Sequence, residues 1–404
     1  MVIIKKLSRL PLYIIAFFAL VIVRFIRPLL LIRFGSLMSS RIGHFAANTE
    51  LYLCEQDAGI NVPKQTYIDI FFFSYEPVCN QQMAIMWKRI LHIWPSWLCT
   101  PLTRINRLIP GGSAHEIGDN TNGDRDVLGL LNKSQPHLKF TMEEEEKGKA
   151  GLSELGIPPG ERFVCMIVRD AAYLSEYLTH EDFSYHNYRD CDVKNFLLSA
   201  EELANRGYFV IRMGVKVLSP MLSKNPKIID YATNGLRSDL MDIYLGSRCD
   251  FCITVGTGFD AIPLIFHRPI VQVNAVPLGY CHAFDSSRIL LSKHHIDSNS
   301  GLELCLSEIF SRGVGFSLSA LDFESKGVTL IENTPEEIRD VVIEMVERLA
   351  GNWHSSPTEE ALQQRFWEIF PTKAVDAATR KPMYGEFYSR FGANYLQNNS
   401  EWLC

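Results

Sequence analysis

Between residues 162 and 275, short apolar runs alternate with segments of helical spacing, and this alternation limits the possible folds more than any other feature of the chain. The apolar runs are RFVCMIVRD, YFVIRMG, CDFCITVG and PIVQVNAVPLG, and amphipathic segments such as DVKNFLLSAEELANRG lie between them. Strands that alternate with helices are typical of parallel βαβ units. We therefore expect a doubly wound α/β sheet in this part of the chain.

A second, shorter alternation opens the chain. Residues 29–37 and 66–74 are apolar enough for strands, and residues 45–59 between them have helical spacing. Residues 111–160 are polar and irregular and contain the acidic run EEEEKGK, so we place a domain boundary in this region. A chain of 404 residues is also expected to form about two domains. We predict an α/β fold of the GT-B type, in which two doubly wound Rossmann-like domains face a cleft.

The first 27 residues differ from the rest. Leu10–Val23 is an uncharged apolar run, too short for a standard membrane span of about 20 residues. On a helix, one sector contains the basic residues that flank it, which are Lys5, Lys6, Arg9, Arg24 and Arg27. We predict a membrane-anchor helix that lies in the interface of an anionic membrane. A signal peptide and a single membrane span are the alternatives.

The predicted parts of the chain are therefore four. Residues 1–27 form the basic amphipathic anchor, and residues 28–150 form the acceptor domain. Residues 151–350 form the donor domain, and residues 351–404 form a helical extension that packs back on the body.

Charge and cysteine content narrow the class of protein. The net charge of −6 gives no general attraction to nucleic acid, so we predict no nucleic-acid partner. The ten cysteines are scattered, with no CxxC pair and no metal-ligand spacing. Several lie in apolar runs, where a reduced cysteine acts as a small hydrophobic side chain. We predict a reducing cytoplasmic compartment, no metal and no cofactor.

The stretch TVGTGFDAIPLIFH begins at Thr254, after the apolar run CDFCI. Its residues Gly256, Thr257 and Gly258 fall where a strand is expected to end and a helix to begin. Ligands of open α/β sheets bind outside the carboxyl ends of strands, and free amides at a helix N-terminus favour anions. We predict that this turn binds a diphosphate, and a tight turn that needs glycine for steric reasons alone is the alternative. The patterns GxGxxG and GK[ST] are absent.

Other residues near predicted strand ends extend this donor site. Arg169 and Arg212 are suited to bidentate phosphate binding, with structural salt bridges as the alternative. Arg237 and Asp239 open the next helix, where Asp239 fits an N-cap as well as a ribose ligand. Asn274 ends the following strand and is placed to contact a base or a sugar hydroxyl.

The acceptor side belongs to the first domain. The sequence SSRIGH follows the first predicted strand, so we expect Arg41, Gly43 and His44 to face the cleft. An inverting transferase needs a base, and histidine is suited to that role near neutral pH. We predict His44 as the base, with Glu50 and Asp69 behind it. A structural histidine, and a retaining mechanism without such a base, remain open.

The segment YHNYRDCD supplies a polar loop at the predicted cleft mouth, formed by Tyr185, His186, Asn187 and Arg189. Its DxD sequence, Asp190 to Asp192, opens a helix and does not close an apolar strand, so we interpret it as a cap and not as a metal site.

Two further patterns also argue against a metal. Adjacent histidines point apart on regular structure, so we predict that His294 and His295 lie in a loop. The stretch GDNTNGDRD lacks the oxygen spacing and the closing glutamate of a calcium loop.

Several segments resemble a bacterial family of surface-polysaccharide glycosyltransferases. They are RIGHFAANTELYL, DFSYHNYRD, GYFVIRMG, VPLG and, most specifically, residues 237–274. The resemblance covers about residues 30–350 and implies a GT-B fold and a nucleotide-sugar donor. It leaves the donor sugar and the acceptor undefined. Sugar-nucleotide epimerases with a GT-B-like shape share the same pattern.

The sequence therefore predicts a metal-independent glycosyltransferase at the cytoplasmic face of a bacterial inner membrane. Its expected partners are a nucleotide-sugar, a glycan or lipid-linked acceptor and the anionic membrane surface. A sugar-nucleotide epimerase is the alternative enzyme, and a non-catalytic scaffold that keeps the fold is the alternative without chemistry.

Overall fold

The computed structural model describes residues 10–118, 125–172 and 184–404. Its contacts divide the chain into two units, and each is considered by itself. The N-terminal unit contains Met1–Asp124 and Lys133–Phe140, and the C-terminal unit contains Arg125–Asn132 and Thr141–Cys404. The last change from one unit to the other falls after residue 140, ten residues before the predicted domain boundary at residue 150. Before it, Arg125–Asn132 belong to the C-terminal unit and Lys133–Phe140 to the N-terminal unit. The cleft expected between two domains stays a prediction.

The N-terminal unit is built on two parallel strands. β1 (Leu31–Leu37) pairs along its full length with β2 (Tyr67–Phe73), and the helix α3 (Ile42–Asp57) connects them. Single bridges at Phe34–Glu116 and Phe71–Ile93 extend the pair on both sides. The remaining elements are α4 (Gln81–Lys88), α5 (Ser96–Leu108) and the short 3₁₀ helix η1 (Gly112–His115). The predicted βαβ opening is therefore present, but the described strands form a smaller sheet than a doubly wound domain.

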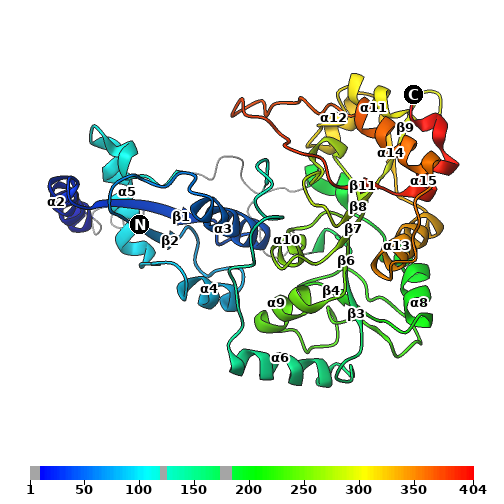
Figure 1. The fold of residues 1–404 in the computed structure, drawn as a ribbon, viewed down its shortest axis with the longest axis horizontal. Helices are drawn as coiled ribbons and strands as arrows, with labels where there is room; N and C mark the ends of the chain where they lie inside the picture. The colour runs from blue at the N-terminus through cyan, green and yellow to red at the C-terminus, as the bar shows by residue number, and fades with distance from the viewer. Residues whose placement is uncertain (1–9, 119–124, 173–183) are drawn as a thin grey trace. The chain divides into compact units, whose positions relative to one another are not determined.

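Helix α2 (Leu10–Ile26) lies beside α5 in this unit (Figure 1). Ala16 and Leu20 are buried on its inner face, and Arg24 donates to the carbonyl of Gly111 and to Oδ1 of Asn106. Arg24 therefore faces protein, contrary to the predicted basic membrane face. Lys5, Lys6 and Arg9 lie outside the described residues. Among the helices that the structure describes, none has both the length and the hydropathy to span a membrane.

The opposite face of α2 carries an exposed apolar stripe. Its members recur every three or four residues along one side of the helix, and they are Ile14, Phe18, Ile22 and Phe25. Phe18 is 62% exposed and Phe25 is 82% exposed. Large apolar side chains gathered on one exposed face are unusual for a soluble surface and mark a surface for interaction.

The C-terminal unit contains a seven-stranded sheet in the order β11-β8-β7-β6-β3-β4-β5. Every pair in it is parallel, as the alternation of strands and helices predicted. The strands are β3 (Phe163–Ile167), β4 (Phe209–Met213), β5 (Ile228–Ile229), β6 (Cys252–Thr254), β7 (Ile270–Ala275), β8 (Arg288–Ser292) and β11 (Arg390–Phe391). From β3 the chain moves outward to β4 and β5 and then returns to the other side of β3 with β6. The topological switch point therefore lies between β3 and β6.

Helices lie on both sides of this sheet, with α9 and α10 on one side and α8 and α13 on the other (Figure 1). The helices are α6 (Met142–Glu154), α8 (Leu197–Asn205), α9 (Asp239–Arg248), α10 (Ala261–Ile265), α11 (Leu306–Ser311), α12 (Ala320–Ser325), α13 (Pro335–Leu349), α14 (Pro357–Ile369) and α15 (Ala393–Asn398). The 3₁₀ helices are η2 (Ser184–Arg189), η3 (Val193–Phe196), η4 (Gly258–Asp260), η5 (Leu278–Tyr280) and η6 (Ser400–Trp402). Thr334 and Glu337 form a capping box at the start of α13.

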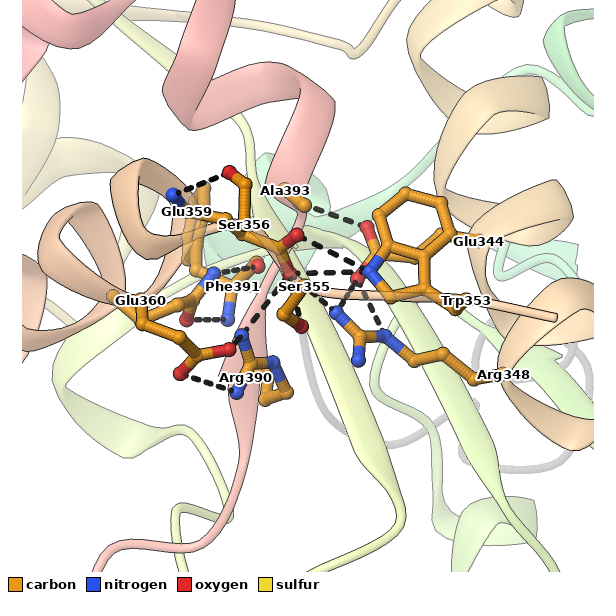
Figure 2. Close-up of polar contacts among 11 residues, drawn as sticks. Glu344, Arg348, Trp353, Ser355, Ser356, Glu359, Glu360, Arg390, Phe391 and Ala393 are labelled. Carbon is orange, nitrogen blue, oxygen red and sulfur yellow. Dashed lines mark hydrogen bonds and ion pairs between the residues drawn. The ribbon is translucent and has the colours of Figure 1, made fainter. Parts of the chain in front are cut away.

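Residues 351–404 are an integral part of the C-terminal unit and not an added helical layer. β11 is the outermost strand of the main sheet, and the side chain of Gln363 on α14 pairs with the backbone of Phe391. A buried ionic network also connects residues 351–404 to α13. In this network Arg348 of α13 and Arg390 of β11 both donate to Glu359 of α14 (Figure 2). Cys305 and Cys404 form a disulfide, which the scattered cysteines did not predict.

Residues 80–98 form α4, a break and the start of α5, and Pro101 lies inside α5. One local prediction is wrong. His294 and His295 lie in β9 (His294–Asp297), which pairs with β10 (Val328–Ile331), and not in a loop. The two rings do point apart: His294 contacts Glu303 and Glu337, whereas His295 is buried against the carbonyl of Lys293.

Candidate functional site

The carboxyl ends of β3 and β6 define the candidate site in the C-terminal unit. Arg169 and Asp170 follow β3, and the turn with Gly256, Thr257 and Gly258 follows β6. Strands whose connections run in opposite directions leave a crevice at the switch point, and α/β proteins bind ligands there. The predicted turn is therefore at the place where this topology favours a ligand.

The turn itself is closed from within. Gly256 has φ of +81°, which explains why glycine is required. Its amide donates to Thr254 Oγ1 at 3.0 Å, and the amide of Thr257 donates to Asp260 Oδ1 at 3.2 Å. Thr254 and Thr257 hydroxyls donate to the same carboxylate oxygen at 2.6 and 3.0 Å. The predicted cradle of Gly256 and Thr257 amides is thus already bonded to side chains and does not face a ligand in that form.

Two amides of the turn remain. In the described part of the chain, the amides of Gly258 and Phe259 have no hydrogen-bond partner. Asp260 lies beneath them and is buried, and burial raises the pKa of its carboxyl group.

Arg189 supplies the positive charge at this turn. Its Nη2 donates to the carbonyl of Gly256, while its Nε is buried and has no hydrogen-bond partner among the residues that the structure describes. No carboxylate in the described chain pairs with it. Burial, followed by the nearby charge of Arg169, lowers the pKa of Arg189. A guanidinium held in this way is stabilised by a bound anion, because an anion adds a charged acceptor and offsets the repulsion.

Arg169 completes the cationic pair. Its Nε donates to Asp190 Oδ1 at 3.0 Å, and its side chain is 15% exposed. Lys293 at the end of β8 donates to the backbone carbonyl of Asp190 at 2.7 Å. Burial raises the pKa of Asp190 despite the adjacent arginine. Asp190 therefore holds Arg169 and Lys293 at one edge of the sheet.

A groove of about 1060 Å³ lies beside this charged edge. Asn187, Tyr188 and Asp190 line it on one side, together with Lys293. Residues of β10, α12 and the segment that follows β10 line much of the rest, and the wall mixes apolar side chains with amide, hydroxyl and carboxylate groups. Its size suits a small-molecule ligand, and its polar groups offer hydrogen bonds to one.

Two predicted donor residues have structural contacts instead. Arg212 is 1% exposed, and its Nη1 donates to the Ser219 carbonyl at 2.7 Å and to Asp230 at 3.3 Å. Asn274 is buried with φ of +52°, and it exchanges backbone-to-side-chain bonds of 2.7 Å with Asn333. Neither is accessible to a ligand. A polar residue inside an apolar strand, as in FVIRM, was a sign of burial.

Arg237 and Asp239 also lie in a structural cluster. Ser238 and not Asp239 caps α9, since its side chain accepts from the Met241 amide. Arg237 donates to Asp242 at 2.5 Å and more weakly to Asp239 at 3.4 Å. Burial raises the pKa of Asp242 to about 7, against the effect of Arg237.

The residues of the predicted polar loop, Tyr185 to Asp192, have different roles in the structure. Asp192 caps η3 by accepting from the Lys194 amide, as the cap interpretation of the DxD sequence predicted. Tyr185 and Asn187 are exposed on η2, and the rings of Tyr185 and His186 lie 4.0 Å apart. No local pattern predicted that Arg189 would contact the Gly256 turn, because 67 residues separate Arg189 from Gly256.

The predicted acceptor residues lie around the start of α3 in the N-terminal unit. Arg41 is the exposed N-cap residue, Gly43 is in the first turn, and His44 follows. The Nδ1 of His44 is buried, with no hydrogen-bond partner in the described part of the chain. Glu50 does not support His44, since its carboxylate contacts His137 instead. Asp69 forms a bidentate pair with Arg33, with both bonds at 2.6 Å.

Comparisons with known proteins add a general similarity of fold. The sequence matches no protein-family model and no curated protein. Among solved structures, a glycosyl transferase family 9 protein from Veillonella parvula DSM 2008 is similar, with a TM-score of 0.45 and 12% identity over 80% of this chain and 99% of that one. E. coli ADP-heptose lps heptosyltransferase II is also similar, with a TM-score of 0.41 and 11% identity over 79% of this chain and 98% of that one. At these values neither similarity establishes a shared function.

Proposed function

We propose that this protein is a glycosyltransferase whose C-terminal unit binds the diphosphate of a nucleotide-sugar donor at the β3–β6 switch point. The observation that carries the proposal is Arg189, a partly buried guanidinium that contacts the Gly256 turn and lies near Arg169, and whose Nε has no hydrogen-bond partner among the described residues. A diphosphate supplies the charged acceptor that Arg189 lacks in that part of the chain.

Stabilisation of the leaving group is the chemistry that the arrangement supports. As the glycosidic bond to the diphosphate breaks, negative charge grows on the departing phosphate. Arg189 and Arg169 would hold that charge, and the amides of Gly258 and Phe259 would donate to the same group. The adjacent polar groove would take the sugar or the nucleoside. In this proposal the chain's own cations act on the phosphate.

The acceptor is proposed to be a lipid-linked or surface glycan presented at the cytoplasmic face of a membrane. The apolar stripe of α2 supports a membrane surface as partner, because its phenylalanine and isoleucine side chains are exposed together. His44 is the proposed base for the acceptor hydroxyl. Its Nδ1 has no partner among the described residues, so the ring nitrogen is not already used in a structural bond.

A thermal-shift screen of the full-length protein against UDP-, GDP-, CMP- and ADP-sugars tests the proposal. We expect one nucleotide family to stabilise the wild type, and Arg189→Met to weaken its binding by about 10- to 100-fold, the equivalent of one charge-assisted hydrogen bond. Arg268→Met is the matched control, because Arg268 also donates to a backbone carbonyl, that of Ser247, but precedes β7 at the opposite edge of the sheet.

The same screen can reject the proposal. If no sugar nucleotide stabilises the folded wild type, or if Arg268→Met weakens binding as much as Arg189→Met does, donor binding at the switch point is wrong. Release of free sugar or transfer to an acceptor by the wild type, with no epimerised donor, separates a transferase from an epimerase.

A further inference from the structure

The N-terminal unit contains a group of three potential metal ligands that the proposed sugar transfer does not use. Glu50 and Cys54 lie one turn apart on α3, and His137 comes from the segment 133–140 of the same unit. A carboxylate oxygen, the Cys54 sulfur and a ring nitrogen of His137 all lie within 4.8 Å of one another. The three side chains therefore converge although 83 residues separate Cys54 from His137.

Burial and hydrogen bonding set this group apart from an ordinary polar contact. Glu50 is 1% exposed and Cys54 is fully buried. Oε1 of Glu50 accepts from the His137 amide at 3.0 Å and lies 2.9 Å from Nδ1. Its other oxygen, Oε2, is buried and has no hydrogen-bond partner in residues 10–118, 125–172 and 184–404. A buried carboxylate oxygen without a donor is costly, and a bound cation would satisfy it.

The orientation of the His137 ring matches that of a metal ligand. Nδ1 faces Glu50, while Nε2 lies 3.1 Å from Oδ2 of Asp57 on the last turn of α3. Histidines that bind metals usually donate their second ring N–H to a carboxylate, which fixes the tautomer and orients the ring. Asp57 would have this orienting role and would not itself contact the ion.

We propose that Glu50, Cys54 and His137 bind a zinc ion. Thiolate, imidazole and carboxylate are the ligands that zinc prefers, whereas magnesium and calcium prefer oxygen alone. Ligand atoms of a tetrahedral zinc site lie about 3.3–3.6 Å apart, and the three observed ligand atoms lie within 4.8 Å of one another, so the group would rearrange around the ion. Oε2 of Glu50 would occupy the fourth position. One thiolate and one carboxylate balance the charge of Zn²⁺.

Zinc in this place would fasten the segment 133–140 to α3. That segment follows Arg125–Asn132, which belong to the C-terminal unit, and it returns to the N-terminal unit through His137. The competing explanation is a protonated imidazole between the carboxylates of Glu50 and Asp57. Contacts with Cys54 and then Glu50 raise the pKa of His137 to about 10, so this alternative also accounts for the geometry without an ion.

Cobalt substitution distinguishes the two explanations. Full-length protein freed of metal by a chelator is titrated with Co²⁺ and then with Zn²⁺. We expect one Co²⁺ per chain with a near-ultraviolet charge-transfer band from thiolate to cobalt, and loss of the cobalt spectrum when Zn²⁺ is added. Cys54→Ser should remove the band and weaken zinc binding by more than about tenfold. Asp57→Asn should keep the band and weaken zinc binding about 10- to 100-fold.

Cys99→Ser is the matched control, because Cys99 is another fully buried cysteine of the same unit and does not belong to the group. It should bind Co²⁺ and Zn²⁺ as the wild type does. Absence of the thiolate band in folded wild type, or an unchanged band in Cys54→Ser, would overturn the proposal. If circular dichroism shows that Cys54→Ser does not fold, the cobalt band of the wild type and the zinc affinity of Asp57→Asn test the proposal. Asp57 has an exposed side chain, so its replacement should not disturb folding. None of these readouts depends on sugar transfer.

Discussion

Replacing Glu359 with glutamine tests how residues 351–404 are held in the C-terminal unit. Oε1 of Glu359 accepts from Arg348 at 2.7 Å, from Arg390 at 3.1 Å, from Ser355 at 3.1 Å and from the Trp353 indole at 3.2 Å (Figure 2). The side chain is only 4% exposed. Glutamine keeps the shape and one acceptor but removes the charge that strengthens the two arginine bonds.

The size of the effect follows from what the arginines retain. Arg348 keeps Glu344 at 2.9 Å, and Arg390 keeps Glu360 at 2.7 Å, so neither guanidinium is left unpaired. The loss should therefore be smaller than the 3–5 kcal/mol typical of a buried charge left alone. Two hydrogen bonds lose the charge of their acceptor, and each should then contribute about 1 kcal/mol less to the free energy of unfolding. With the disturbed contact to the Trp353 indole, the total loss should be about 2–3 kcal/mol. For a unit of this size that lowers the melting temperature by about 4–6 °C.

Glu360→Gln is the matched control, because Glu360 pairs with the same Arg390 but is 51% exposed. An exposed ion pair contributes under about 1 kcal/mol. Urea unfolding followed by circular dichroism at the helix band avoids the local effect on Trp353 fluorescence. Equal losses in the two variants would refute the reasoning, because burial and shared donors would then make no difference.

Three further predictions concern other parts of the chain. Burial alone would lower the pKa of His294, but its bonds to two glutamates outweigh burial and raise it to about 10. The stability that this pairing contributes is fully present below about pH 6.5 and is lost as pH rises through about 10. The urea midpoint of the wild type should therefore fall over this pH range relative to that of His294→Gln. Urea midpoints that change in parallel with pH in the two proteins would contradict this. Replacing three residues of the exposed stripe of α2, Phe18, Ile22 and Phe25, with serine should weaken binding to anionic vesicles by more than about tenfold and leave the circular dichroism spectrum unchanged. Wild-type binding by this variant would exclude the stripe as the membrane contact. Gly148→Ala should lower the free energy of unfolding by about 1–3 kcal/mol, because the new Cβ would lie 2.4 Å from the Tyr244 ring. Gly151→Ala should lower it less, because the new Cβ would meet the flexible Met241 side chain. A lower melting temperature for Gly151→Ala than for Gly148→Ala would be evidence against this packing.

The main sheet could be predicted from sequence because its information is local. The apolar runs at β3, β4, β6 and β7 are each bounded by a helix of clear spacing, and parallel pairing follows from their order. β5 and β11 are two residues long, and no apolar run marks them. Their place in the sheet depends on long-range contacts, such as that of Gln363 with Phe391. This is why residues 351–404 were expected only as a helical extension that packs back on the body, with no strand in the sheet.

The candidate site was predicted only in its location. The spacing of Thr257 and Asp260 matches a capping box, so a local signal did exist for the carboxylate that occupies the turn amides. Arg212 was assigned to phosphate from its position near a strand end, although its apolar neighbours indicated burial. The contact of Arg189 with Gly256 and the meeting of His137 with Cys54 join distant parts of the chain, and no local pattern predicts either.

The central claim is that the switch point of the C-terminal unit binds a diphosphate through Arg189. A crystal structure of the full-length protein, soaked with the nucleoside diphosphate that stabilises it most, tests this claim directly. The account predicts phosphate oxygens within hydrogen-bond distance of the Arg189 guanidinium and of the Gly258 or Phe259 amide. A diphosphate bound elsewhere, with Arg189 still bonded only to the Gly256 carbonyl, would contradict it.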